Sequence, residues 1–222
     1  WDYQNGQGEW STSADPTAYT WNFKRATGFM DVVAYTGTGS AHAESHNLGV
    51  APEMMIIKPR DLSYQWSVWQ KDIASASPYY EIVLNSSNAQ TDANDTNSPF
   101  AGVPTSTGIP LPSGTASASN RSGYNYIAYL FATLAGVSKV GSYTGNAGYA
   151  VNVDCGFSAG ARFILIKRTD STGDWYTYDS ARGIVAGNDP YLLLNSTAAE
   201  VTNTDYIDPL ASGFTVTSSA PA

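Results

Sequence analysis

The chain has 222 residues, 42% of them hydrophobic and 13% aromatic, which is enough to bury one large core or two modest ones and excludes a disordered chain. The net charge is −8, and the eleven basic residues are scattered, which excludes nucleic acid as a partner because phosphate binding needs clustered Lys and Arg. No apolar run approaches the roughly twenty residues that span a bilayer, so no membrane insertion is expected.

Short segments rich in β-branched and aromatic residues alternate with Gly, Pro, Asn, Asp and Ser clusters along the whole chain. No segment keeps an apolar period of 3.6 residues for ten residues, so no helix is expected. The pattern predicts an all-β fold of tandem β-sandwich units with a jelly-roll-like arrangement. The predicted strands are 29–35, 54–59, 66–70, 80–84, 124–131, 140–143, 162–168, 175–178, 191–194 and 214–217.

One pattern occurs twice, with shifts of 108 to 110 residues between the copies. The order and spacing of the matched segments are kept, and small loop insertions explain the drift in the shift. The matched pairs are 35–39 with 143–147, 54–58 with 163–167, Trp66 with Trp175, 82–86 with 192–196, and 19–23 with 127–131.

These matches divide the chain into three parts. The repeat unit is about 108 residues long. Residues 1–27 are interpreted as the end of a preceding unit or an N-terminal strand segment, 28–133 as the first β-sandwich unit, and 134–222 as a second β-sandwich unit that lacks its last strand. The missing strand corresponds to 126–131. One sheet edge of the second unit is therefore expected to be unpaired unless another chain or the segment 19–23 occupies it.

The segment 85–120 contains the most Ser, Thr, Asn, Gly and Pro and the fewest apolar residues. It is predicted to be a long exposed loop, which is either a contact surface or a tolerated insertion.

Residues 21–39 read Trp-x-Phe-Lys-Arg-Ala-x-Gly-Phe-x-Asp-Val-Val-x-Tyr-Thr-Gly-x-Gly, and residues 46–58 read His-Asn-Leu-Gly-Val-Ala-Pro-Glu-Met-Met-Ile-Ile-Lys. This pattern resembles a repeated domain of unknown function in bacteriophage tail-fibre and virion structural proteins, notably from marine and cyanobacterial phages, and residues 156–175 are similar to the same family. The resemblance implies a virion location and a trimeric or fibrous assembly. It implies no catalytic residues.

Metal-binding and catalytic groups are sparse. His42 and His46 flank Glu44, but two or three possible ligands on one loop favour a solvated turn over a metal site. The lone cysteine, Cys155, lies in an apolar context and is interpreted as a small buried side chain. Asp92 with Asp95 and Asp205 with Asp208 match no known ligand spacing and favour turns. No catalytic residue, metal or cofactor is predicted.

Aromatic side chains are the stronger binding signal, since Tyr and Trp rings stack on sugars while nearby amides and carboxylates bond to hydroxyls. Trp66 and Trp175 match each other and are therefore expected in the core. The candidate glycan-binding residues are Tyr64, Trp69, Tyr79, Tyr176 and Tyr178.

The sequence thus predicts a non-enzymatic structural component of a phage virion appendage, such as a tail fibre, located in the extracellular particle. The expected partners are further copies of the chain, with a trimer favoured, other virion proteins, and host-surface glycans. Two alternatives stay open: an appendage-borne enzyme that degrades glycans, which requires convergent carboxylates, and a free-standing carbohydrate-binding module, which requires a monomer with a discrete sugar site.

Overall fold

The computed structural model describes residues 21–73, 79–92, 98–114, 118–146 and 148–221, and within these ranges the regular secondary structure is β-strand, with no α-helix. None of the described residues belongs to a helix with the length and hydropathy needed to cross a membrane. The predicted all-β class is confirmed. In chain order the strands are β1 (Met30–Thr36), β2 (His42–Ser45), β3 (Met54–Pro59), β4 (Ser67–Gln70), β5 (Tyr80–Val83), β6 (Thr91–Asp92), β7 (Gly108–Leu111), β8 (Asn125–Phe131), β9 (Val151–Asp154), β10 (Phe163–Lys167), β11 (Trp175–Asp179), β12 (Leu192–Leu193), β13 (Ile207–Leu210) and β14 (Gly213–Val216).

A six-stranded sheet, in the order β1-β8-β3-β4-β5-β6, dominates the N-terminal half. Its strands pair antiparallel throughout. β8 lies between β1 and β3, so that Phe131 pairs with Met30 on one side and with Met54 on the other. Alternate β8 side chains are buried, as expected for a central strand whose two faces pack against different layers.

One face of this sheet packs against the β2-β7 ribbon. Side chains from β1, β3, β4 and β8 meet Ile109 and Leu111 of β7 there, together with Leu48 and Phe100 from the connecting segments. Trp69 and Tyr126 are the largest fully buried side chains of this core. The arrangement of two face-to-face sheets is consistent with the predicted sandwich.

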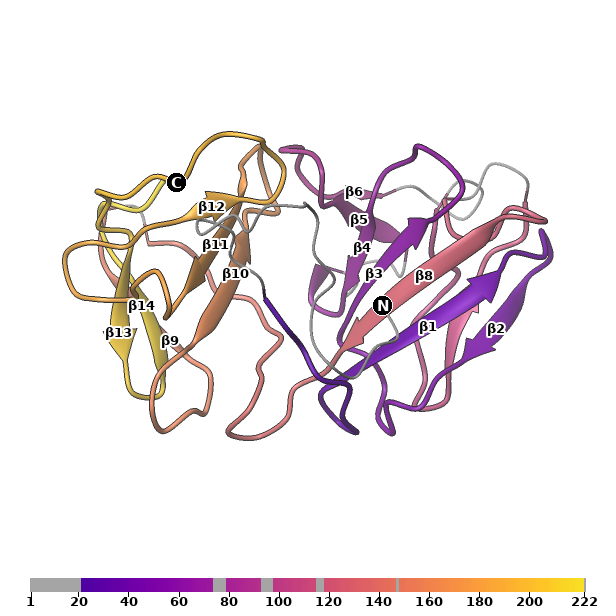
Figure 1. Cartoon of the computed structure of the whole chain (residues 1–222), viewed down its shortest axis with the longest axis horizontal. Helices are drawn as coiled ribbons and strands as arrows, with labels where there is room; N and C mark the ends of the chain where they lie inside the picture. Colours follow the sequence, from indigo (N-terminus) through magenta and orange to yellow (C-terminus); the bar gives the residue numbers. More distant parts are fainter. Residues whose placement is uncertain (1–20, 74–78, 93–97, 115–117, 147, 222) are drawn as a thin grey trace, which may run out of the picture.

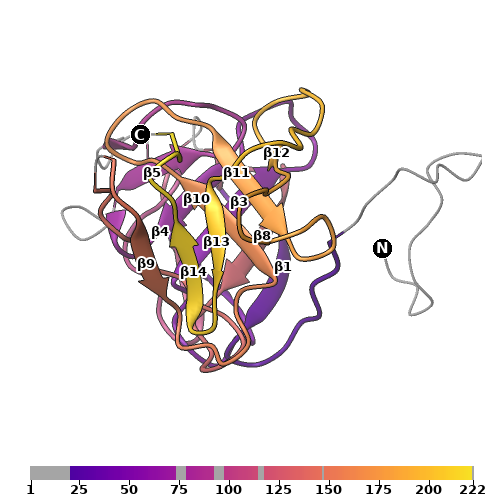
Figure 2. The ribbon, with the colours of Figure 1, turned by 90° about the vertical axis from the view of Figure 1, so that its left-hand side faces the viewer.

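The C-terminal half also contains two sheets, β10-β11-β12 and β13-β14-β9. Figure 2 shows the second of these in front of β10 and β11. Ile164 and Tyr178 of the first sheet pack against Ile207 and Phe214 of the second.

A further core joins the halves, because the remaining face of the six-stranded sheet lies against the β10-β11-β12 sheet (Figure 1). Trp175 packs there with Ile56, Val68 and Ile82, and its indole Nε1 donates to the carbonyl of Val83 at 3.0 Å. The four sheets therefore stack as successive layers along the long axis of the molecule (Figure 1).

Matching hydrogen bonds occur at the spacing of the sequence pattern. The backbone N–H of Trp66 donates to Asn85 Oδ1 at 3.0 Å, and that of Trp175 donates to Asn195 Oδ1 at 2.9 Å. The division of the chain at residue 133 stays an interpretation of the sequence.

Two predictions about secondary structure are wrong. The segment 140–143 is coil rather than a strand, and no strand of the described residues pairs with it. The segment 85–120 is not a simple exposed loop, because its described part contains β6 and β7 and buries Phe100, Ile109 and Asn120. The many Ser, Thr, Asn, Gly and Pro residues of this segment made its few buried side chains hard to identify from the sequence alone.

Gly37 and Gly145 provide a matched test of the difference between the halves. A Cβ at Gly37 would overlap the Arg121 carbonyl oxygen and would lie 2.9 Å from the Tyr126 ring, whereas one at Gly145 would meet nothing within 4 Å. We expect Gly37→Ala to lower the free energy of unfolding by about 2 kcal/mol and Gly145→Ala to change it by less than about 0.5 kcal/mol, as measured by urea denaturation. Equal effects would contradict the structural asymmetry.

Candidate functional site

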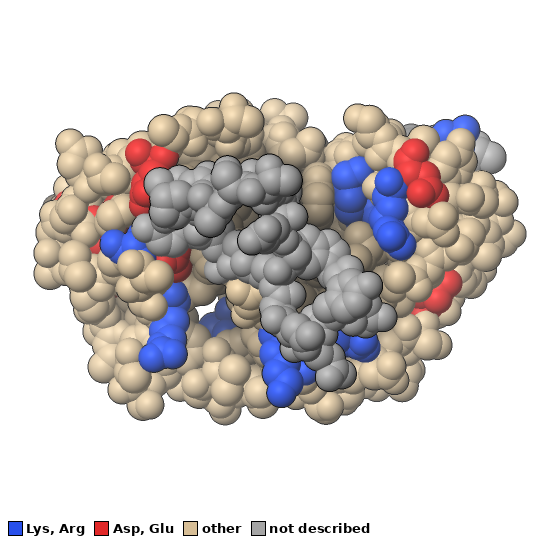
Figure 3. Space-filling model, in the orientation of Figure 1, with Lys and Arg blue, Asp and Glu red and all other residues tan. Residues whose placement is uncertain are grey.

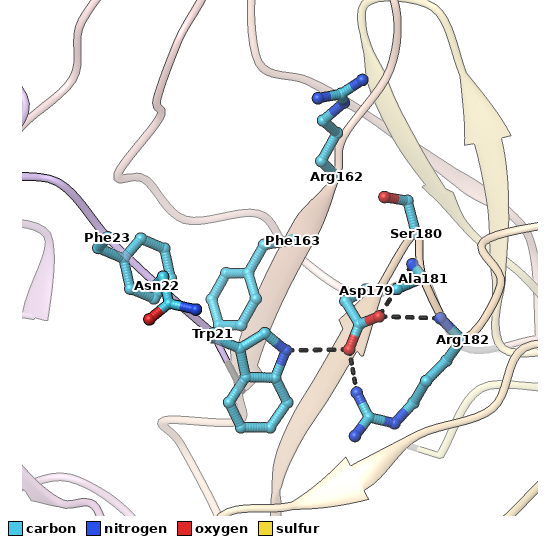
Figure 4. Close-up of a pocket in the computed structure, with 9 residues that line it drawn as sticks. All are labelled: Trp21, Asn22, Phe23, Arg162, Phe163, Asp179, Ser180, Ala181 and Arg182. Carbon is cyan, nitrogen blue, oxygen red and sulfur yellow. Dashed lines mark hydrogen bonds and ion pairs between the residues drawn. The ribbon is translucent and has the colours of Figure 1, made fainter. Parts of the chain in front are cut away.

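Two regions of the C-terminal half combine aromatic and charged side chains. The first, here called the tyrosine cluster, is made of Tyr176, Tyr178, Tyr191 and Tyr206. The second, here called the junction pocket, is a cavity of about 250 Å³ between the N-terminal described residues and β10-β11 (Figure 4). It is lined by Trp21, Asn22, Phe23, Arg162, Phe163, Asp179, Ser180, Ala181 and Arg182.

The tyrosine cluster is built from β11 and two connecting segments. The rings of Tyr191 and Tyr206 are stacked, with centroids 5.7 Å apart and an interplanar angle of 23°. Tyr176 meets both edge-on, at 5.1 Å from Tyr191 and 6.4 Å from Tyr206. Tyr178 lies beneath them, 5.9 Å from Tyr191. Three of the four rings are half-buried and so keep part of their surface in solvent.

Carboxyl and amide groups border the cluster. Burial, followed by the neighbouring Tyr191 and Asp174, raises the pKa of the Tyr176 hydroxyl above its ordinary value. Asp174 is oriented by Asn195, whose Nδ2 donates to Asp174 Oδ1 at 2.8 Å. An aromatic surface with an oriented acceptor beside it is suited to a polyhydroxylated ligand.

Asp189 supports the cluster from below. It is fully buried, and its Oδ2 accepts the backbone N–H groups of Tyr206 at 3.1 Å and Ile207 at 2.8 Å. Burial raises the pKa of its carboxyl despite these hydrogen bonds. These bonds hold the Tyr206 backbone in place, so Asp189 is a positioning residue rather than a ligand-binding one.

Of the five predicted glycan-binding residues, the structure brings only Tyr176 and Tyr178 together. Trp69 and Tyr178 are 1% and 2% exposed, which corrects the prediction that they stack on a sugar. They occupy matching places, three residues after Trp66 and Trp175, and each fills the core of its own half. Tyr64 is 48% exposed and Tyr79 is half-buried, and both lie in the N-terminal half, away from the cluster.

Sequence reasoning missed Tyr191 and Tyr206 as functional candidates. Tyr191 falls within a predicted strand but has no matching aromatic residue in the first half, and this difference between the copies is a signal that the sequence contains. Tyr206 meets Tyr191 only because the backbone returns through an isolated bridge between Tyr191 and Val201. No local sequence pattern predicts the contact between Tyr191 and Tyr206.

The junction pocket is organised by a buried ion pair. The Asp179 carboxylate pairs with the Arg182 guanidinium, and the two side chains are 8% and 5% exposed. The indole Nε1 of Trp21 donates to Asp179 Oδ2 at 2.9 Å, and the Arg182 guanidinium lies 5.2 Å from the centre of the indole ring (Figure 4). Trp21 thus bonds to the anion and stacks on the cation of one pair.

Hydrogen bonding decides the ionisation of Asp179. Burial opposes the charged form, but the Trp21 indole, the backbone N–H of Arg182 and the Arg182 guanidinium together hold the pKa of the carboxyl below its ordinary value. The backbone N–H groups of Ala181 and Arg182 donate to Oδ1 at 3.0 and 2.9 Å. The charged carboxylate is therefore an integral part of this pocket.

The other candidate groups do not converge. His42 Nε2 lies 3.0 Å from Glu44 Oε1, whereas His46 Nε2 lies 3.0 Å from the Thr105 carbonyl oxygen. Among the described residues, no three His, Cys, Asp or Glu side chains are placed to hold a metal. Cys155 is partly buried, and burial raises the pKa of its thiol, which disfavours the reactive thiolate. Asp95 lies outside the described residues.

Comparison with known proteins gives one match. A family model described as "Domain of unknown function (DUF7483)" matches residues 1–222. Neither a curated protein nor a solved structure matches the chain. The match confirms a domain of unknown function, while the phage origin and the repeated nature of the domain stay predictions.

Replacement of Asp179 should loosen the junction pocket. We expect Asp179→Asn to lower the free energy of unfolding by about 2 kcal/mol, because it removes one anionic partner of the buried Arg182 guanidinium and leaves another, Glu200, whose Oε1 lies 3.1 Å from Arg182 Nε. The wild-type contribution is present above about pH 4, the ordinary carboxyl pKa, and is lost as the pH falls through the lower pKa of the folded state. Urea denaturation at pH 7 and pH 3 should therefore show a larger difference in the free energy of unfolding between the two proteins at pH 7.

The exposed Asp170, paired with Arg168, provides the control substitution Asp170→Asn, which should leave the free energy of unfolding unchanged. A difference between wild type and Asp179→Asn that is independent of pH would contradict this role.

Proposed function

We propose that this chain, which belongs to the DUF7483 family of domains of unknown function, is a structural component of a phage virion appendage such as a tail fibre. We further propose that its tyrosine cluster binds glycans of the host surface. The virion location rests on the resemblance of residues 21–39 and 46–58 to repeated domains in phage virion proteins. The binding role rests on the chemistry of the cluster.

The half-buried rings of Tyr176, Tyr191 and Tyr206 are the observation that carries the binding proposal. Tyrosine rings that are fixed by one another lose little conformational entropy when a ligand binds, and their faces match the apolar faces of pyranose rings. Asp174 adds an acceptor for sugar hydroxyls at the border of the cluster. A polar, weakly charged surface suits a ligand without formal charge.

Binding is favoured over glycan hydrolysis by the state of the nearby carboxyl groups. Hydrolysis requires an acid and a second carboxylate roughly 5 to 9 Å apart, both reaching the scissile bond. Asp189 is fully buried and bonded to backbone N–H groups, and Asp174 is held by Asn195. On the described part of the face shown in Figure 3 the charged side chains are scattered, and the basic ones there form no continuous stripe that would favour a polyanionic ligand.

Loss of aromatic surface should weaken glycan binding. We expect Tyr176→Ala and Tyr206→Ala each to reduce binding about fivefold, since one stacked ring contributes on the order of 1 kcal/mol. The measurement is titration of the purified chain on an array of uncharged bacterial surface glycans. Tyr149→Ala, at a tyrosine that is 71% exposed and outside the cluster, is the matched control and should bind like wild type. Binding by wild type that neither cluster variant reduces would exclude the cluster as the site.

The appendage proposal also predicts self-association. Light scattering should give a mass of about three times the 23.6 kDa of one chain, because a trimer is the assembly implied by the resemblance. A monomer that binds a glycan would favour a free-standing carbohydrate-binding module. A monomer that binds none would contradict both parts of the proposal.

A further inference from the structure

β10 has one strand-pairing edge occupied and one open. It pairs with β11 as β3 pairs with β4, and Leu165 faces Thr177 much as Ile56 faces Val68. The other edge of β3 is covered by β8 over the full length of the strand. Among the described residues no strand covers the corresponding edge of β10. That edge presents unpaired backbone N–H and C=O groups, which can pair with an added strand.

The sequence pattern identifies the segment that fits this edge. Segment 54–58 of β3 matches 163–167 of β10, and segment 127–131 of β8 matches 19–23. Phe131 pairs with Met54 in the first half. The counterpart of that pair in the second half is Phe23 with Phe163.

The structure places these two counterparts in contact. The ring of Phe23 meets that of Phe163 at 5.2 Å, and Trp21 meets the same ring at 5.9 Å, both edge-on. Figure 4 shows Trp21 and Phe23 beside Phe163, with the indole nitrogen directed at Asp179. The bond from Trp21 to the buried Asp179 carboxylate gives the contact a polar anchor as well as an apolar one.

We propose that the open edge of β10 is a strand-acceptor site whose occupant is the segment around Trp21 and Phe23 of the same chain. In the structure residues 21–25 are coil, and Trp21 and Phe23 contact β10 through their side chains. Backbone pairing like that of β8 with β3 is the step that this proposal adds, with the junction pocket as its anchor. The same chain is favoured over a second copy because Trp21 and Phe23 already lie on Phe163 of their own chain. This inference rests on the sequence match between the halves and is independent of glycan binding.

Hydrogen exchange in the full chain tests the backbone pairing. We expect the double substitution Trp21→Ala with Phe23→Ala to raise the exchange of β10 amides that point away from β11 at least tenfold, because their partners are released. The amides of β3 beyond Met54 should be unchanged; Met54 itself is left out because it pairs with Phe131, whose ring Phe23 contacts at 6.1 Å. Tyr64→Ala with Tyr149→Ala, at two exposed tyrosines, is the matched control and should alter neither strand. Unchanged β10 exchange in the Trp21 and Phe23 variant would overturn the proposal.

The double variant could be destabilised, so that hydrogen exchange rises throughout the protein. A peptide-binding measurement tests the proposal in that case as well. A fluorescein-labelled peptide of residues 17–25 should bind the double variant, measured by anisotropy, at least tenfold more tightly than it binds wild type, whose own segment occupies the edge. The same peptide with alanine in place of Trp21 and Phe23 should bind neither protein. Failure of the native peptide to prefer the variant would overturn the acceptor site.

Dilution distinguishes the source of the occupant. Occupation by the same chain predicts that β10 protection in wild type is independent of protein concentration. Protection that fades on dilution, together with a falling mass by light scattering, would overturn the assignment to the same chain and favour a second copy. The variants Tyr176→Ala and Tyr206→Ala should leave peptide binding unchanged, so failure of the glycan proposal and failure of this one give different results.

Discussion

β8 is the strand on which the larger sheet depends, because it pairs with β1 through one edge and with β3 through the other. Without it, β1 would have no partner in the sheet, and β3 would expose a row of backbone polar groups. Its alternating side chains also contribute to two cores at once, with Tyr126, Ala128 and Leu130 on one face and Tyr129 and Phe131 on the other. A strand in this position converts two otherwise separate ladders into one sheet.

Among the described residues of the C-terminal half, no strand takes the place that β8 has in the larger sheet. β10 and β11 form as β3 and β4 do, because a hairpin needs only its two strands. The segment that matches β1 stays an exposed coil, and its Tyr143 is 38% exposed where the corresponding Tyr35 is 8% exposed. Tyr35 stacks on Tyr126 of β8, and an aromatic side chain without that support stays in solvent. The contacts of Trp21 and Phe23 with Phe163 are made beside this open edge.

The same asymmetry separates structural from surface aromatic residues. Trp66, Trp69, Trp175 and Tyr178 sit at matching places and contribute to the cores, so repetition indicates packing. Tyr191 and Tyr206 have no matching aromatic partner and form part of a half-buried cluster. The reason is packing, since a core position must be filled by a large side chain in both halves, whereas the side chain at a surface position can differ between them.

The sequence by itself determined the strand class, most strand positions and the matching places of Trp66 and Trp175, because two-residue alternation and turn residues act locally. It also pointed to Tyr176. Only the tertiary structure decided that Trp69 and Tyr178 are buried, that the segment 85–120 contributes β7 to a core, and that Tyr176, Tyr191 and Tyr206 meet. It alone placed Trp21 on the Asp179–Arg182 pair, 158 residues away along the chain from Asp179. Such contacts depend on which sheets face one another, and that choice is set by the summed packing of all layers rather than by any local pattern.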